Sequence, residues 1–367
     1  MAELSLCMIV RDEEERLEQC LQSVKEAVDE IVIVDTGSKD RTKEIALRYT
    51  DSVYDDVWQD DFAAARNRAF SLASKPFILW MDADDVIDAQ EIPKLIRLKQ
   101  ELNDQIDAVM MPYHYAFSSD GKASLILERE RIVRRAAGFV FEGAVHEAMT
   151  VMGNVIHADV VVRHTGTHGH KSNRRNLAIY EKQIASGKKM TARDQYYYAR
   201  ELKNADQLEK AERAFAAFLE GNGWIENRID AYIQRGECLQ KLGRVSEAKR
   251  SLLLSFAEAS PRAEALCALG ACLMEEGELN AAVFWFESAL HCRMPRESGA
   301  FVSPDAYGYI PLMQLCVCYD RMGEHRKAAQ MNEQALLLHP DDEAANRNRA
   351  YFAGILQNAQ TEAQNLG

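Results

Sequence analysis

Residues 76–85 read PFILWMDADD, an apolar run that ends in three carboxylates. A short apolar run bounded by turn-forming residues is typical of a buried strand in a parallel sheet. Two further strand candidates lie upstream, at residues 4–10 and 31–34. Helical patterns follow them, at residues 13–28 and 39–49. This alternation predicts βαβ units and an α/β domain with a mostly parallel sheet.

A second acidic residue also closes a strand candidate, in VIVDTGSKD at residues 32–40. Asp35 can accept a hydrogen bond from a nucleobase N–H or a ribose hydroxyl. Ligands of open α/β sheets collect at the carboxyl ends of the strands, so we expect Asp35 and the acids of residues 82–85 to line one site. The alternative is that Ser38 or Asp40 caps the next helix and Asp35 only ends its strand.

The three acids of residues 82–85 repel one another unless a cation is present. Carboxylate oxygens suit Mg²⁺ or Mn²⁺, and such an ion could bridge them to a diphosphate. The alternative is an acidic loop before the helix that starts near Ala89, for which Asp88 would suffice as a cap.

From about Asp194 onward the strand pattern stops and small residues repeat. The spacing is 34 positions for three pairs, which is the tetratricopeptide period: Gly236 and Gly270, Gly243 and Gly277, Ala248 and Ala282. A further copy follows at Gly323 after an insertion at residues 294–305, and a degenerate earlier copy has Asp206. The sequence therefore predicts about four helix pairs in an all-α solenoid. The expected domains are residues 1–190, 191–350 and a C-terminal tail at 351–367.

Cysteine and charge limit the class of protein. Cys238, Cys272 and Cys318 each lie five residues before a repeat glycine, as small packing residues would, and the eight cysteines are expected to be mostly reduced thiols. The net charge of −13 argues against binding to a nucleic-acid backbone. The N-terminal residues lack the features of a secretory signal, and no apolar stretch is long enough for a membrane span, so a cytoplasmic protein is expected.

Four segments together resemble a family 2 glycosyltransferase of the GT-A (Rossmann-like) fold: residues 6–14, VDTGS at 34–38, ARN at 65–67 and DAD at 82–84. The resemblance covers roughly the first half of the chain. With the repeats added, the layout is similar to bacterial family 2 enzymes, including the sublancin-type peptide S-glycosyltransferases. These relatives imply a nucleotide-diphosphate sugar, a UDP-sugar above all, together with Mn²⁺ or Mg²⁺ and inversion at the anomeric carbon.

The resemblance also assigns residues, although Thr36 stands where the family more often has a second aspartate. Asp84, the second acid of the Asp-x-Asp motif, ligates the metal, and Asp82 faces the ribose side of the site. The donor-binding residues so implied are Val10, Arg11, Asp35, Arg66, Asp82, Ala83 and Lys171, and the implied metal ligands are Asp84, Asp82 and His164.

An inverting transferase needs a base that takes the proton of the acceptor. The segment FEGAVHE at residues 141–147 offers Glu147 as the first choice, with Glu142 and Asp85 as alternatives. His146 could bind the acceptor or hold the base. A structural ion pair is the competing interpretation for each of these carboxylates.

A histidine-rich stretch, RHTGTHGHK, follows at residues 163–171. Its spacing does not supply a closed tetrahedral zinc set. The resemblance instead implies that a histidine after this strand, here His164, completes the metal site or contacts the diphosphate. Lys171, Arg174 and Arg175 could fold over the diphosphate, or could form a solvated helix face.

The preferred function is sugar transfer from a UDP-sugar to a Ser, Thr or Cys side chain of a peptide or protein bound through the repeats. Two alternatives stay open. One is synthesis of a cell-surface polysaccharide or lipid-linked glycan, and the other is a non-catalytic tetratricopeptide adaptor. Homodimerisation also stays open.

Overall fold

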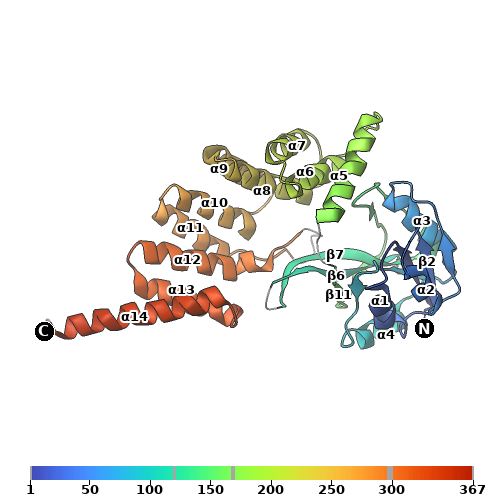
Figure 1. Ribbon diagram of the computed structural model, residues 1–367, viewed down its shortest axis with the longest axis horizontal. Coiled ribbons are helices and arrows are strands. Elements are labelled where there is room, and N and C mark those ends of the chain that lie inside the picture. The colour runs from blue at the N-terminus through green and yellow to red at the C-terminus, as the bar shows by residue number, and fades with distance from the viewer. Residues whose placement is uncertain (1, 119–120, 167–169, 296–300, 366–367) are drawn as a thin grey trace. The chain divides into compact units, whose positions relative to one another are not determined.

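The computed structural model describes residues 2–118, 121–166, 170–295 and 301–365 (Figure 1). The chain divides into two compact units, Met1–Ala116 with Ile126–Tyr197, and Phe117–Leu125 with Tyr198–Gly367. This division falls inside helix α6 (Ala192–Asn204). The domain boundaries expected from the sequence stay a prediction.

The first unit is built on a nine-stranded sheet of order β3-β2-β1-β4-β7-β6-β11-β5, with β10 beside β6. Five neighbouring pairs run parallel, and the pairs β4–β7 and β5–β11 run antiparallel. The predicted mostly parallel sheet is confirmed. Its strands are β1 (Leu4–Val10), β2 (Glu30–Asp35), β3 (Val53–Asp55), β4 (Phe77–Trp80), β5 (Asp85–Val86), β6 (Ala108–Phe117), β7 (Ala123–Arg134), β10 (Val155–His157) and β11 (Val162–His164).

Strand β1 lies at the centre of the parallel part, and six of its seven residues are buried. Its register pairs Val10 with Asp35 on one side and Cys7 with Trp80 on the other. Because all three strands point the same way, their carboxyl ends meet at one edge of the sheet. The residues that follow β1, β2 and β4 are therefore brought together there.

The helices of this unit are α1 (Leu17–Val24), α2 (Thr42–Leu47), α3 (Phe62–Leu72), α4 (Ile92–Glu101) and α5 (His170–Ala185). Helix α1 begins four residues later than residue 13, where the pattern predicts its start. In the turns before it, Thr42 Oγ1 accepts from the backbone of Glu13 at 2.6 Å, and Asp40 Oδ2 accepts from the backbone of Glu14 at 3.1 Å.

The second unit contains four helix pairs, in agreement with the number that the repeat period predicts (Figure 1). The pairs are α6 with α7 (Leu208–Glu220), α8 (Ile225–Lys241) with α9 (Val245–Leu254), α10 (Ala263–Glu275) with α11 (Leu279–Leu290), and α12 (Tyr309–Arg321) with α13 (His325–Leu338). The turn inside the second pair shows why glycine recurs: Gly243 has a φ of +73° and donates to Gln240, and Arg244 donates to Leu239. This is the Schellman pattern, and its left-handed residue is usually glycine.

The same turn closes the other three pairs. Asp206 takes the left-handed position in the first pair with a φ of +57°, in place of the glycine. Gly270 has a different task, because a Cβ there would lie 2.6 Å from the ring of Phe286. It allows the two helices of a pair to approach closely. Cys238, Cys272 and Cys318 are fully buried packing residues, and the pKa of the Cys238 thiol is raised by burial to about 11.

Helix α14 (Glu343–Asn365) follows the last pair and continues across residue 351, where the sequence predicts a tail to begin. Among the described residues, no helix combines the length and the apolar character that crossing a membrane requires.

Candidate active site

The loop after β2 is shaped by Asp35. This buried carboxylate accepts three hydrogen bonds on Oδ1, from Gly37 N at 3.1 Å, Ser38 N at 2.9 Å and Ser38 Oγ at 2.8 Å. Thr36 donates from its backbone to Val10 O at 3.0 Å, which ties this loop to the end of β1. Asp35 thus lies at the predicted edge of the sheet, with one oxygen engaged in its own turn.

The loop after β1 is tied to the same place. Asp12 donates from its backbone to Ser38 Oγ at 3.0 Å, and Asp12 Oδ1 accepts from Lys39 N at 2.7 Å. Arg11, the predicted neighbour of the nucleobase, is an exposed side chain next to this junction, whereas Val10 is buried at the end of β1.

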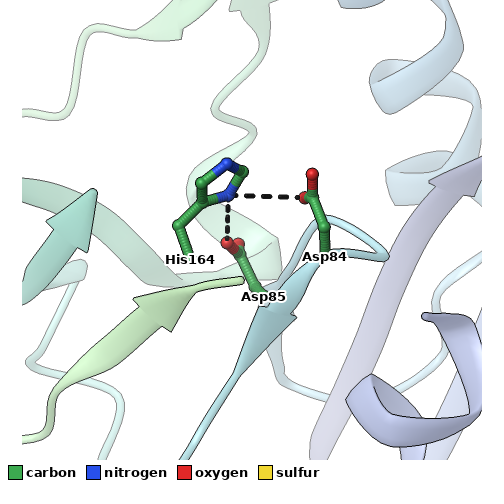
Figure 2. A group of neighbouring side chains, drawn as sticks. All are labelled: Asp84, Asp85 and His164. Atoms are coloured by element: carbon green, nitrogen blue, oxygen red, sulfur yellow. Dashed lines mark ion pairs between the residues drawn. The ribbon is translucent and has the colours of Figure 1, made fainter. Parts of the chain in front are cut away.

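A group of two carboxylates and one imidazole lies after β4 (Figure 2). Asp84, Asp85 and His164 each offer one ligand atom, and these atoms all lie within 4.8 Å of one another. His164 Nδ1 lies 3.5 Å from Asp84 Oδ1 and 3.6 Å from Asp85 Oδ1. The short strands β5 and β11 produce this arrangement, because their antiparallel register places His164 opposite Asp85.

The three members of this group have different surroundings. Asp85 is fully enclosed: its Oδ2 pairs with Arg131 Nη1 at 3.0 Å, and its Oδ1 accepts from Tyr113 at 2.8 Å. Burial opposes its charge, but Arg131 and the hydrogen bonds with His164 and Tyr113 together outweigh burial, so the pKa of Asp85 is lowered. Asp85 therefore acts as an internal anchor of the loop, and its enclosure leaves no approach for an acceptor.

Asp84 and His164 carry the properties of a cation site. Burial, followed by the charge of Asp82, raises the pKa of Asp84 to about 6. Burial lowers the pKa of His164, but the hydrogen bond to Asp85 and the charge of Asp84 outweigh it, so the pKa is raised. The negative charge of Asp82 contributes to both shifts, and a divalent cation would compensate that charge.

The backbone leaves room at this point because residue 166 is glycine. A Cβ on Gly166 would clash with Asp84 Oδ2 and would lie 2.6 Å from His164 Nε2, the second ring nitrogen. Gly166 therefore lies in close contact with both candidate ligands. One carboxylate and one imidazole are ligand types that suit a divalent ion of the Mn²⁺ type.

Arg66 joins the donor side of the site to the predicted base. Its Nη2 lies 2.6 Å from Asp82 Oδ1, and its Nε lies 2.5 Å from Glu147 Oε1. Burial opposes the charge on this guanidinium, but Asp82 and Glu147 outweigh burial and raise its pKa. The structure therefore pairs Arg66 with two carboxylates, where the resemblance had implied a contact with the base or phosphates of the donor.

The segment that carries Glu147 is held by the ARN motif of α3. Asn67 Nδ2 donates to Phe141 O at 2.9 Å, and Phe141 N donates to Asn67 Oδ1 at 2.8 Å. This clamp fixes the short hairpin of β8 (Phe141–Glu142) and β9 (Ala148–Met149). Glu147 lies buried in its loop, whereas Glu142 is exposed on β8.

His146 occupies the same loop in a left-handed conformation, with a φ of +52°. Its ring stacks on Tyr197 with centroids 4.2 Å apart, and Arg193 Nε donates to its backbone oxygen at 3.0 Å. These contacts position the loop, which fits the role of holding the base.

Strand β7 contributes arginines that the sequence analysis missed. The guanidinium of Arg131 lies 4.1 Å from the ring centre of Trp80, and that of Arg129 lies 4.8 Å from it. With Arg66 at 4.7 Å, three cations contact this one indole. The alternation of charged residues in LERER at 127–131 was the available signal, because charges inside a strand otherwise bounded by apolar residues require partners.

Glu13 was also missed. Burial, followed by the charge of Asp84, raises its pKa to about 7, so it adds to the acidic character of the site. The side chains of His170 and Lys171, and all of His168, lie outside the described residues. Arg175 lies 4.7 Å from the ring centre of Phe62.

A family model and several named proteins are similar to parts of this chain. The model of the family described as glycosyl transferase family 2 matches residues 5–153. The glycosyltransferase SunS from Bacillus subtilis is 26% identical over 216 residues, which are 56% of this chain and 50% of that protein. The lipopolysaccharide core biosynthesis glycosyltransferase LpsC from Rhizobium meliloti is 27% identical over 206 residues, which are 51% of this chain and 73% of that protein.

This chain is also similar to proteins that contain tetratricopeptide repeats. A TPR repeat-containing protein from Synechococcus elongatus is 46% identical over 107 residues, which are 29% of this chain and 25% of that protein. The solved structure of YrrB, a TPR protein, covers 49% of this chain and 84% of its own at 21% identity and a TM-score of 0.38. The chain spans half or less of the length of the SunS and Synechococcus proteins. It combines a family 2 glycosyl transferase domain with tetratricopeptide repeats.

Proposed function

We propose that this chain is an inverting, metal-dependent glycosyltransferase that uses a UDP-sugar. The observation that carries the proposal is the convergence at one sheet edge of Asp35 after β2 and the pair of Asp84 and His164 after β4 and β11. A nucleotide diphosphate needs a polar group for its nucleoside and positive charge for its phosphates, and this edge provides places for both.

Asp84 and His164 would hold the divalent ion, and Gly166 allows the backbone to approach both side chains closely. We favour Mn²⁺, because an imidazole ligand is less suited to Mg²⁺, which prefers oxygen ligands only. When bound, the ion supplies positive charge to the departing diphosphate. Asp85 holds the loop in place through Arg131 and Tyr113.

Glu147 is the proposed base. The acceptor hydroxyl or thiol gives its proton to the Glu147 carboxylate while its oxygen or sulfur forms a bond to the anomeric carbon. The bond from that carbon to the diphosphate oxygen breaks, and the diphosphate leaves with the electron pair. Attack opposite the leaving group inverts the anomeric configuration. Arg66 compensates the charge of the buried Glu147 and holds it in place.

For the acceptor, we propose a Ser, Thr or Cys side chain of a peptide or protein. Helical repeats present extended concave surfaces that suit such chains. A glycan acceptor is the second candidate, and the similarity to LpsC, whose name places it in lipopolysaccharide core synthesis, favours it.

The first test is calorimetric titration of the full chain with UDP, with and without Mn²⁺, on wild type and Asp84→Ala. Binding that requires Mn²⁺ and disappears in the variant would support the proposal. A matched control is Asp159→Ala, which removes an exposed carboxylate far along the sheet from this group and should bind UDP as wild type does. Equal binding by wild type and Asp84→Ala would exclude Asp84 as a metal ligand.

A further inference from the structure

The segment between α11 and α12 reaches the first helix of the repeat unit. The ring centre of Phe301 lies 4.1 Å from the guanidinium carbon of Arg200 on α6. Two residues of the same segment, Ser303 and Tyr307, contact Glu264 on α10. Residues 301–307 thus contact two first helices of the array, α6 and α10.

These first helices form one continuous face. Arg200 Nη1 on α6 lies 3.3 Å from Asp230 Oδ2 on α8, and Gln240 Nε2 on α8 donates to Glu275 Oε1 on α10 at 2.7 Å. In helical repeat arrays the first helices of the pairs line the concave surface that binds partners. The chain's own segment therefore lies on the face that an acceptor peptide would use.

Part of the segment, Pro304–Tyr307, forms a short 3-10 helix, and hydrogen bonds to α10 hold the segment in place. Glu264 Oε1 accepts from the backbone N–H of Ser303 at 3.0 Å, and its Oε2 accepts from the Tyr307 hydroxyl at 3.0 Å. Cys267 Sγ lies 3.6 Å from Ala306 O, and the Ala306 side chain belongs to the apolar core of α10 to α12. A second peptide can use the same two groups, because Glu264 accepts from a backbone N–H and the Arg200 guanidinium contacts an aromatic ring.

The far end of the segment is anchored as well. Asp305 Oδ1 lies 3.0 Å from His339 Nε2 at the end of α13, and the His339 ring packs against Tyr309. The anchor at His339 and the contact with Arg200 bracket the residues between them. The segment can thus leave the face at Phe301 and Ser303 while it stays attached near Tyr309.

We infer that residues 301–307 are an internal occupant of the peptide-binding face, and that an extended peptide binds there by displacing them from Arg200 and Glu264. The inference rests on the proposed function only where it names the acceptor as that peptide. Tethering gives the internal segment an effective concentration on the order of millimolar, so weak ligands are excluded and a matching peptide is selected.

The test uses a fluorescein-labelled peptide of residues 301–310, FVSPDAYGYI, as the probe, added to the full chain. In the variant Phe301→Ala with Tyr307→Phe the tethered segment loses two contacts, and we expect the probe to bind about tenfold more tightly than to wild type. Adding Glu264→Gln should abolish this gain. Phe284→Ala, at an exposed ring on α11, is the matched control and should bind as wild type does.

A second measurement covers the case in which the released variant does not fold. Hydrogen exchange of wild-type residues 301–307 should become faster when the probe is present at millimolar concentration. Exchange that stays unchanged, or equal probe binding by wild type and a folded released variant, would overturn the inference. Neither readout needs sugar transfer, so a chain that failed to bind UDP would leave this result intact.

Discussion

Arg66 and Glu147 form a buried ion pair, Nε to Oε1 at 2.5 Å, across 81 residues of sequence. The same guanidinium holds Asp82, so one cation compensates two carboxylates inside the site. Arg66 therefore contacts both the proposed base, Glu147, and Asp82 on the donor side of the site.

Replacing Arg66 with Met should destabilise the protein by about 3–5 kcal/mol, because the buried Glu147 and the half-buried Asp82 lose their partner. Urea unfolding measures this loss. The double variant Arg66→Met with Glu147→Gln should recover part of it. The control is Arg41→Ala, whose pair with Glu14 is exposed on the Arg41 side by 74%, and it should leave the stability almost unchanged. Equal losses for Arg66→Met and Arg41→Ala would contradict the importance of the buried pair.

Glu147→Gln should lower kcat by about 10²- to 10⁴-fold with little change in the affinity for UDP, because it removes proton transfer and keeps the shape. The measurement is initial rate with a synthetic acceptor, alongside UDP binding. Glu142→Gln is the discriminating partner: as an exposed residue on β8 it should keep the rate. A large loss in Glu142→Gln and none in Glu147→Gln would move the base to Glu142.

In the metal-free protein, the contribution of Asp84 and His164 to the free energy of unfolding should decrease as pH rises. Asp84 keeps its proton in the folded state up to a pKa of about 6, against an ordinary 3.8, so its stabilising contribution is present below pH 4 and lost by pH 6 to 7. His164, whose folded pKa is raised above 6.5, adds a loss in the same direction as pH rises through that raised value.

Asp84→Asn isolates this effect, since the other titrating groups remain. Between pH 4.5 and 7 the stability of wild type relative to the variant should fall by about 1–3 kcal/mol. Mn²⁺ binds the deprotonated carboxylate and the neutral imidazole, so its addition should raise wild-type stability at pH 7.5 much more than at pH 5. A difference that stays flat with pH would show that Asp84 has an ordinary environment.

Gly166→Ala should weaken Mn²⁺ binding by about tenfold or more, because the added methyl group pushes Asp84 and His164 apart. Gly354→Ala is the matched control, since a Cβ there meets nothing within 4 Å, and it should leave Mn²⁺ binding unchanged. Circular dichroism of both variants checks that the fold is kept. Undiminished binding by Gly166→Ala would place the ion elsewhere.

Asn67→Ala should cost about 1–3 kcal/mol in stability, because it leaves the backbone of Phe141 without two hydrogen bonds. It should also lower kcat, since the segment leading to Glu147 loses its attachment. Asn103→Ala is the control, because that amide makes only local contacts at the surface. Unfolding and rate measured on the same two variants separate the effects on stability and on catalysis.

The sequence was sufficient for the parts of the site that follow strands. Asp35 and Asp84 end or follow short apolar runs, and the parallel register of β1 with β2 and β4 brings them to one edge, as strand-end reasoning predicts. The repeat glycines could also be predicted from the sequence, because each meets one steric requirement at a fixed spacing.

Pairings across distant segments were not predictable in the same way. Arg131 reaches Asp85 only because β7 pairs antiparallel with β4. No local sequence pattern predicts that pairing. The Arg66 side chain was expected at the donor, and no local pattern pairs it with Asp82 and Glu147, which lie on separate segments. Helix α1 begins at Leu17, later than its pattern predicts.

The clamp between Asn67 and Phe141 has a consequence for substitutions in the segment that it holds. Both of its hydrogen bonds go to backbone atoms of residue 141, so they do not depend on which side chains the clamped segment carries. The amide of Asn67 therefore holds the start of the segment that leads to Glu147 through the backbone alone.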